Sequence, residues 1–184
     1  MGIGREREDR RPVAAHKIRD AVTPVRHADR LEVRRFRADR RQRRPQSIDD
    51  AEGLAAQLNA VRADSAMVVK ADLLDTTTIT PLVADVVAHF GRLDGLVCNA
   101  SSFFPTPLGQ ISETDWHDLV GSNFKAPLFL AQAAAPHLRA AGGCLINITD
   151  IHAERPLAGY PLYAAAKGAL LTLTRALAIE MAPD

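Results

Sequence analysis

Tyr163 and Lys167 are the two residues whose types and spacing are best suited to acid–base chemistry. They lie four residues apart at the start of a helical pattern, so their side chains share one face of the helix. A phenol with an ordinary pKa of about 10 exchanges protons poorly at neutral pH, but a nearby ammonium favours the phenolate and lowers that pKa. The Tyr-x-x-x-Lys pair is therefore a sensible acid–base unit, although the same spacing also occurs in surface pairs that have no chemical role.

The elements that must position this pair alternate between helix and strand. Ser112 with Asp115 predicts a capping-box helix start, and Gly91 and Gly142 follow two predicted helix ends. Apolar residues at helical spacing predict helices over 49–62, 76–90, 113–141 and 163–181. Continuous apolar runs predict strands over 66–71, 93–100 and 144–148. Apolar strands that alternate with helices are typical of an α/β fold, a parallel sheet covered by helices on both faces.

Polar residues follow the ends of the three predicted strands. Asp72 follows the first strand, Asn99 ends the second, and Asp150 follows the third, thirteen residues before Tyr163. Asn123 is a polar amide within the long apolar helix, where it requires a partner. Ligands of open parallel sheets bind beyond the carboxyl ends of the strands. This edge of the sheet is therefore the place to look for chemistry.

These positions, in this order and at these distances, resemble the short-chain dehydrogenase/reductase family. The family pattern is an Asp after the third strand, an Asn-containing turn after the fourth, an Asn in the long helix, and then Ser…Tyr-x-x-x-Lys. The resemblance covers residues 66–184 and implies a Rossmann-like, doubly wound parallel sheet and an oxidoreductase activity with NADP(H). Related enzymes have a further strand and a Gly-rich turn before this region and more strands after it, so we expect a sheet incomplete at both ends.

Two departures from the family pattern resemble the pteridine reductases. Asp150 replaces the usual Ser, and the usual Asn-Ala-Gly turn is here Asn99-Ala100-Ser101-Ser102-Phe103. The narrower resemblance implies an NADPH-dependent reductase of pterin- or dihydrofolate-like substrates. Two alternatives stay open, namely another carbonyl substrate, because loop residues set specificity, and an inactive truncated fragment.

The resemblance implies a role for each catalytic candidate. Tyr163 would supply the proton during reduction. Asp150 would pair with Tyr163, either passing protons or holding the donor-rich amino-pyrimidine edge of the pterin. Lys167 would lower the pKa of Tyr163 and hydrogen-bond the nicotinamide ribose. Asn123 would hold a water or a helix carbonyl that links Lys167 to solvent.

The resemblance also implies the residues that contact the adenosine part of NADPH. Asn99 and Ala100 would line the adenosine side of the cofactor. Asp72 would accept a hydrogen bond from the adenine amino group, with Leu73 beside the ring. The simpler interpretation of Asp72 is a helix N-cap.

On the substrate side, the resemblance implies contacts from the loop that follows the second predicted strand. Ser101 would contact a cofactor phosphate or the pterin. Phe103 would stack on the pterin face opposite the nicotinamide. The simpler interpretation of Phe103 is a core aromatic residue of its own loop.

Residues 1–46 form a compositionally separate segment. They contain 14 Arg, one Lys and seven acidic residues, a formal charge of +8, against −7 for residues 47–184. So little apolar surface predicts disorder or weak helix. A nucleic-acid-binding arm, a transit peptide and a non-native start produced by a shifted reading frame are the three interpretations. We favour the last, because the Gly-rich turn expected at this place is missing, and we divide the chain into an atypical segment 1–46 and a partial reductase domain 47–184.

Composition bears on membrane insertion, secretion, metal binding and the state of the cysteines. The chain has no apolar run of about 18 residues or more and no apolar leader, so we expect neither a membrane span nor a secretory signal. Cys98 and Cys144 lie in strand-like runs, which predicts buried thiols in a reducing cytoplasm. The six histidines show no metal-ligand spacing, so we expect no metal site. Nucleic acid is not an expected partner, and the resemblance implies a homo-oligomer, a tetramer.

Overall fold

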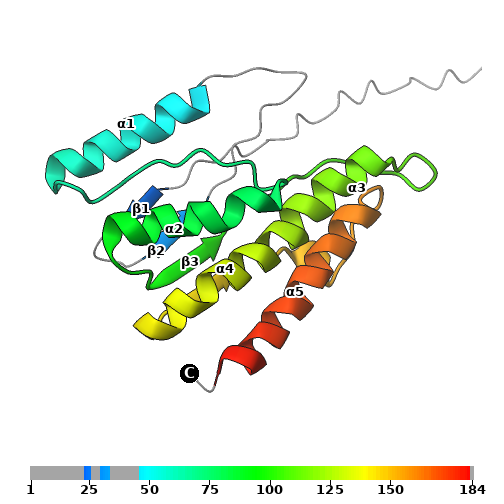
Figure 1. Cartoon of the computed structure of the whole chain (residues 1–184). Coiled ribbons are helices and arrows are strands. Elements are labelled where there is room, and N and C mark those ends of the chain that lie inside the picture. The colour runs from blue at the N-terminus through cyan, green and yellow to red at the C-terminus, as the bar shows by residue number, and fades with distance from the viewer. Residues whose placement is uncertain (1–22, 26–29, 34–45, 183–184) are drawn as a thin grey trace, which may run out of the picture.

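The computed structural model describes the backbone of residues 23–25, 30–33 and 46–182 and the side chains of residues 48–182. Its sheet has the order β1-β2-β3-β4 within this part of the chain (Figure 1). The strands are β1 (Thr23–Val25), β2 (Arg30–Val33), β3 (Gly95–Cys98) and β4 (Cys144–Asn147). β2, β3 and β4 are parallel neighbours, whereas β1 is antiparallel to β2. The predicted α/β class, an incomplete Rossmann-like sheet, is confirmed.

Five α-helices accompany these strands in the described residues. They are α1 (Gln46–Val61), α2 (Ile79–Phe90), α3 (Glu113–Val120), α4 (Ala126–Ala141) and α5 (Pro161–Met181). The capping box of Ser112 and Asp115 opens α3, as predicted. Gly91 and Gly142 end α2 and α4 with φ angles of 79° and 61°, a left-handed conformation that glycine adopts without a Cβ penalty.

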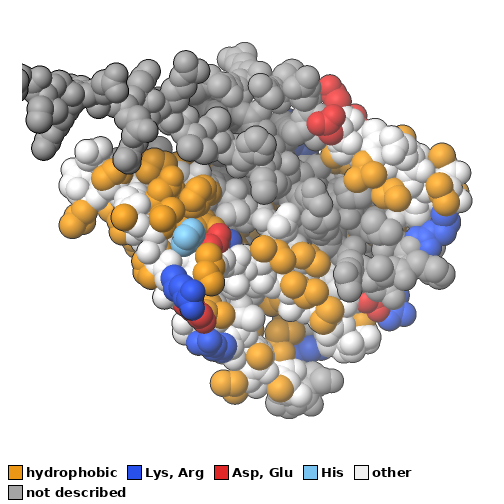
Figure 2. All heavy atoms as spheres, turned by 180° about the vertical axis from the view of Figure 1, so that it is seen from behind, with side chains coloured by type: hydrophobic (Ala, Val, Ile, Leu, Met, Phe, Trp, Pro, Cys, Tyr) orange, Lys and Arg blue, Asp and Glu red, His pale blue; other side chains and the backbone are white. Residues whose placement is uncertain are grey.

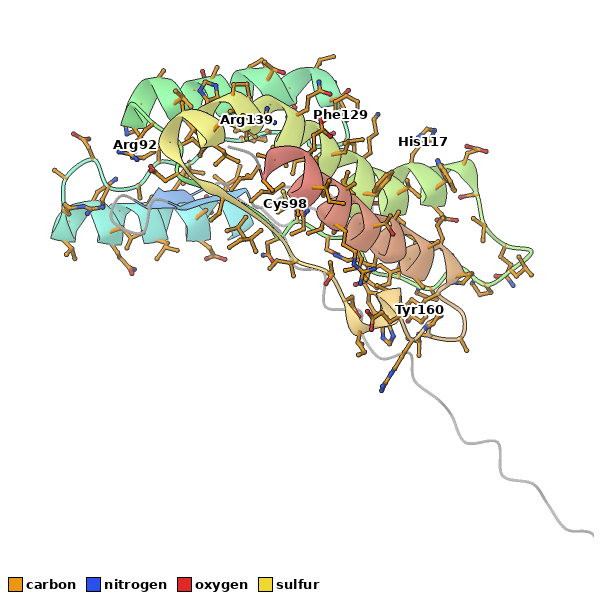
Figure 3. The ribbon with its side chains drawn as sticks, turned by 90° about the horizontal axis from the view of Figure 1, so that it is seen from below. Arg92, Cys98, His117, Phe129, Arg139 and Tyr160 are labelled. Carbon is orange, nitrogen blue, oxygen red and sulfur yellow. The ribbon has the colours of Figure 1, made fainter. Side chains whose placement is uncertain are left out.

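The core lies between the sheet and the helices α2 and α4. Leu96 of β3 is 0% exposed, and it packs with apolar side chains of α2 and α4 that include Val83, Val86, Leu130 and Leu138. Figure 3 shows α2 and α4 on one side of the sheet and α1 on the other. α5 packs against α3 and against the short 3-10 helix η3 (Ile151–Ala153). This packing brings the start of α5 to the carboxyl end of β4.

Two expectations about the elements differ from the structure. The helix predicted over 113–141 is interrupted by a π-helix, η2 (Gly121–Lys125), between α3 and α4. The strand predicted over 66–71 is replaced by an extended segment with a single bridge at Val69. Met67, Val69 and Ala71 pack against the core, so packing alone satisfies the apolar pattern without the ladder of hydrogen bonds that defines a strand.

The N-terminal segment and Cys144 also differ from expectation. Two parts of the segment predicted as disorder or weak helix, 23–25 and 30–33, are strands, because the edge of the buried strand β3 offers hydrogen bonds to β2. The remainder of that expectation lies outside the described residues. Cys98 is buried as predicted, but Cys144 is exposed. Cys144 lies on the edge strand β4, where Ile146 and Ile148 are also exposed.

By length and composition alone, α5 could cross a membrane, and it is the one such helix in the described part of the chain. Its most apolar 18-residue window has a mean hydropathy of 1.3 and is 33% buried inside the structure. The helix also carries the buried polar side chains Tyr163 and Lys167, both of which bond to groups after β4. These contacts attach the first turns of α5 to the rest of the fold.

Candidate active site

The first turns of α5 and the backbone after β4 bring Tyr163 and Asp150 together. Pro161 lies at the first position of α5, where its missing N–H costs nothing. Asp150 has an extended backbone and caps η3 by accepting from the His152 N–H at 2.9 Å. The Tyr163 hydroxyl donates to the Asp150 Oδ2 at 2.6 Å. A phenol and a carboxylate are therefore held in direct contact, as the sequence predicted.

Lys167 lies one turn further along α5, with only 3% of its surface exposed. Its Nζ donates to the carbonyl oxygen of Ile148 at 2.9 Å and lies 5.8 Å from the centroid of the Tyr163 ring. The ammonium is thus fixed at the carboxyl end of β4, beside the phenol ring, but it bonds to the backbone and not to the phenol oxygen.

The environment of Asp150 and Tyr163 separates their protonation states. Burial alone would raise the pKa of Asp150, but hydrogen bonds from His152 and Tyr163 and the nearby positive charges outweigh it and hold that pKa below its usual value. Burial, followed by the bond to Asp150 and its negative charge, raises the pKa of Tyr163, and a hydrogen bond with Ser101 partly offsets the rise. At neutral pH Asp150 is a carboxylate and Tyr163 keeps its proton.

The expected lowering of the Tyr163 pKa by Lys167 is therefore not what the structure shows. The carboxylate of Asp150 touches the phenol oxygen, whereas the ammonium lies beside the ring, so burial and the anion decide the direction. A serine at position 150, as in the general family pattern, would not impose this negative charge. Burial of the phenol is thus the larger reason for the difference, and the replacement of Ser by Asp adds to it.

Lys167 is itself strongly perturbed by its surroundings. Burial lowers its pKa to about 8, although Asp150 and Cys98 act in the opposite direction. Cys98, at the end of β3, has a pKa raised to about 12 by burial, so it is a neutral thiol. Cys98 is therefore a buried core residue and not a nucleophile.

Asn123 lies in the π-helix η2 and is completely buried. Its Oδ1 accepts from the Ser101 hydroxyl at 2.7 Å, and its Nδ2 donates to the carbonyl oxygens of Ser102 at 2.9 Å and Leu119 at 3.0 Å. Asn123 does hold a helix carbonyl, as expected. Its bonds, however, connect it to the loop after β3 and not to Lys167.

Phe103 lies beside Tyr163 with its ring edge-on, at a centroid distance of 4.8 Å and an angle of 77°. Its face is stacked on Tyr160 at 4.6 Å and 11°. The loop therefore brings Phe103 to Tyr163, while its stacking on a substrate ring stays a prediction. Tyr160 was not among the predicted site residues, and its aromatic type directly before the helix-starting Pro161 is the signal that could have found it (Figure 3).

The predicted adenosine-side residues lie at the ends of neighbouring elements. Asp72 is exposed, and its Oδ1 accepts from the Leu74 N–H at 3.0 Å in the turn before α2. Leu73 is 1% exposed within the core, so only its backbone could face a cofactor. Asn99 is half-buried and Ala100 is buried directly after β3. Among the described residues, no group of three or more His, Cys, Asp or Glu side chains could hold a metal ion.

A parallel sheet with a buried Tyr-x-x-x-Lys pair at its carboxyl edge defines a nicotinamide-dependent class of oxidoreductase fold. The chain belongs to the short chain dehydrogenase family, whose family model matches residues 45–184.

Particular relatives are more informative than the family. The chain is 38% identical to pteridine reductase 1 of Leishmania tarentolae, over 74% of this chain and 60% of that protein. It is 31% identical to meso-2,3-butanediol dehydrogenase of Serratia marcescens, over 65% of this chain and 47% of that protein. It is 38% identical to L-fucose dehydrogenase of Oryctolagus cuniculus, over 62% of this chain and 41% of that protein. The chain thus spans about half the length of the curated relatives that it matches.

The family implies a nicotinamide cofactor, and the described residues fit one end of it. An ammonium has three N–H donors, and the Ile148 carbonyl engages one donor of Lys167, which leaves donors for a ribose hydroxyl. Asp72 follows the extended segment 66–71, and Asn99 follows β3. The described residues include no Gly-rich turn for the pyrophosphate. The site therefore fits the nicotinamide ribose better than it fits the phosphates.

Proposed function

We propose that residues 47–184 form the catalytic part of an NADPH-dependent reductase of pterin-type substrates, including dihydrofolate-like ones. The observation that carries the proposal is the 2.6 Å hydrogen bond between Tyr163 and Asp150, at the position where the family pattern has a serine. The identity of 38% to a pteridine reductase supports it. The catalytic residues are Tyr163, Asp150, Lys167 and Asn123.

Tyr163 is the proton donor in this proposal. Its raised pKa keeps the phenol protonated at neutral pH, so a proton is available for the substrate nitrogen. A bound NADPH would supply the hydride to the adjacent carbon, so that one C=N bond gains a hydride and a proton. The negative charge left on Tyr163 would then be stabilised by the neighbouring Lys167 ammonium.

Asp150 serves recognition as well as proton transfer. Its two oxygens accept from His152 and Tyr163, and each carboxylate oxygen can accept more than one hydrogen bond. A carboxylate is complementary to the N–H donors of an amino-pyrimidine edge. Phe103 would stack on the pterin ring, and Ser101 would bond to the pterin or to a cofactor phosphate.

We also propose that the protein is cytoplasmic and associates with further copies of itself, up to the tetramer implied by its family. Several large apolar side chains are exposed, Ile179 at 79% among them. Hydrophobic side chains gather in several places on the face shown in Figure 2. Exposed apolar surface of this kind favours association. Light scattering coupled to gel filtration measures the oligomeric state directly.

A second candidate is a reductase of small carbonyl compounds. Two relatives are named as dehydrogenases of a diol and of a sugar, and the Tyr163–Lys167 pair by itself does not choose between substrates. The residue that discriminates is Asp150, because a simple carbonyl offers no donor-rich edge for a carboxylate.

The test is NADPH oxidation by the purified chain with dihydrobiopterin, dihydrofolate or 2,3-butanedione as substrate. We expect pterin-dependent oxidation, reduced about 10²–10⁴-fold in Tyr163→Phe because the proton donor is removed. Asp150→Ser, which restores the general family pattern, should lose the pterin activity more than any activity on 2,3-butanedione. A preference of the unchanged chain for the diketone would favour the second candidate. No oxidation with any substrate would favour an inactive fragment.

A further inference from the structure

The loop of residues 99–111, between β3 and α3, has no regular secondary structure but carries Ser101 and Phe103. A cluster of buried polar side chains from the end of α3 and from η2 holds it. We name this cluster, formed by Asp118, Ser122 and Asn123, the loop anchor. Asp118, Ser122 and Asn123 are 4%, 0% and 0% exposed.

Ser102 is bound by the loop anchor from two sides. Its hydroxyl donates to the Asp118 Oδ1 at 2.6 Å, and its carbonyl oxygen accepts from the Asn123 Nδ2 at 2.9 Å. The Ser122 hydroxyl donates to the backbone oxygen of Asp118 at 2.6 Å. Side chain and backbone of one loop residue are therefore fixed to two successive helical elements.

A carboxyl group is expensive to bury, and it is retained where its hydrogen bonds fix a particular arrangement. The π-helix η2 directly follows α3, the helix that carries Asp118, and single-turn π-helices inside α-helical segments are frequent at functional sites. The buried carboxyl group of Asp118 and Asn123 of the π-helix both bond to Ser102, the residue directly before Phe103. Phe103 has Tyr163 and Tyr160 on its ring, so a shift of Ser102 would shift the surface on which a substrate ring stacks.

We propose that Asp118 is a positioning residue for the substrate ring, acting through Ser102 to fix the loop that carries Ser101 and Phe103. The substrate part of this inference rests on the proposed pterin reductase function, whereas the loop part does not. The 2.6 Å hydrogen bond from the Ser102 hydroxyl links Asp118 to the loop that carries Ser101 and Phe103.

Ser102→Ala removes the hydroxyl that Asp118 holds, and Ser112→Ala is its matched control. Ser112 also donates its hydroxyl to an aspartate, Asp115, at 2.7 Å, but this pair is exposed and local to the start of α3. The readout is hydrogen exchange of the Thr106 amide, which donates to the Gly159 oxygen at 2.8 Å. We expect about tenfold faster exchange in Ser102→Ala and no change in Ser112→Ala. Equal exchange in both variants would overturn the inference.

A conservative variant separates positioning from general stability. Asp118→Asn keeps an oxygen that accepts from Ser102 and should retain slow Thr106 exchange, whereas Asp118→Ala should resemble Ser102→Ala. If Asp118→Ala does not fold, Ser102→Ala alone decides, because removal of one hydroxyl leaves the helices intact.

The substrate part is measured by calorimetric titration with dihydrobiopterin. We expect Ser102→Ala to bind it about tenfold more weakly than the unchanged chain, with Ser112→Ala unaffected. If the unchanged chain binds no dihydrobiopterin, the proposed function fails, and Thr106 exchange still decides whether Asp118 fixes the loop. If Ser102→Ala loosens the loop but binds dihydrobiopterin normally, the substrate role of Asp118 is refuted.

Discussion

Asp150 and Tyr163 are in contact, but their surroundings shift their pKa values in opposite directions. The carboxylate is held ionised by the bonds that it accepts, and the phenol is held protonated by burial and by the adjacent anion. Neither state follows from the Tyr-x-x-x-Lys spacing alone, which predicts only a phenol with a lowered pKa. Burial of Tyr163 sets the direction of its pKa shift, and the carboxylate at position 150 reinforces it.

The influence of Asp150 on Tyr163 is directly measurable, because the chain contains only two tyrosines. In a Tyr160→Phe background, Tyr163 is the single tyrosine, and its ionisation can be followed by ultraviolet absorbance. Adding Asp150→Asn removes the negative charge beside the phenol, so we expect the pKa of Tyr163 to fall relative to the Tyr160→Phe parent. An unchanged or higher pKa would show that burial alone accounts for the raised value.

Lys167 makes stability depend on pH. Its pKa is about 8 in the folded chain against an ordinary 10.5, so between these values the unfolded chain binds more protons. The unfavourable burial of the charge is fully present below pH 8 and is relieved as pH rises toward 10.5. From about pH 7 to about pH 9, the free energy of unfolding should rise by roughly 1 kcal/mol relative to Lys167→Met. Urea unfolding at both pH values measures this difference, and a constant difference would contradict the perturbed pKa.

At the scale of elements, the helices could be predicted from sequence better than the strands. Ser112 and Asp115 mark the start of α3, and the glycines after α2 and α4 mark the ends of those helices, as predicted. The strand predicted over 66–71 failed because a ladder depends on a neighbour that local sequence does not specify. The π-helix η2 was not predicted for a similar reason. Asn123 in η2 bonds to Ser101 and Ser102, which are distant in the sequence, so a local pattern does not reveal these contacts.

Two glycines test how tightly the elements pack. A Cβ on Gly143, directly before β4, would lie 2.5 Å from the backbone oxygen of Asp94, whereas a Cβ on Gly53 of α1 would meet nothing within 4 Å. Gly143→Ala should therefore destabilise the fold by about 1–3 kcal/mol. Gly53→Ala should stabilise it by up to about 1 kcal/mol, because alanine is the better helix former. Thermal unfolding of both variants checks the pair, and a harmless Gly143→Ala would mean that the β3–β4 connection is loose.

At the scale of the whole molecule, the proposed catalytic residues and the residues that would bind the cofactor phosphates differ in how well they can be located. Tyr163, Lys167, Asp150 and Asn123 were identified from spacing and resemblance, and the structure brings the first three together at the end of β4. The pyrophosphate site has no Gly-rich turn in the sequence, and most of residues 1–46 lie outside the described residues. Binding of the whole cofactor is thus the property on which the proposed activity most depends.

The most direct test is a calorimetric titration of the 184-residue chain with NADPH. The account predicts micromolar binding that weakens about tenfold in Lys167→Met, since the ammonium would hold the nicotinamide ribose. Absence of binding to a sample whose circular dichroism shows folded helices would contradict the account. The Tyr163–Asp150–Lys167 site would then be intact but idle, and the similarity to pteridine reductases would describe ancestry without activity.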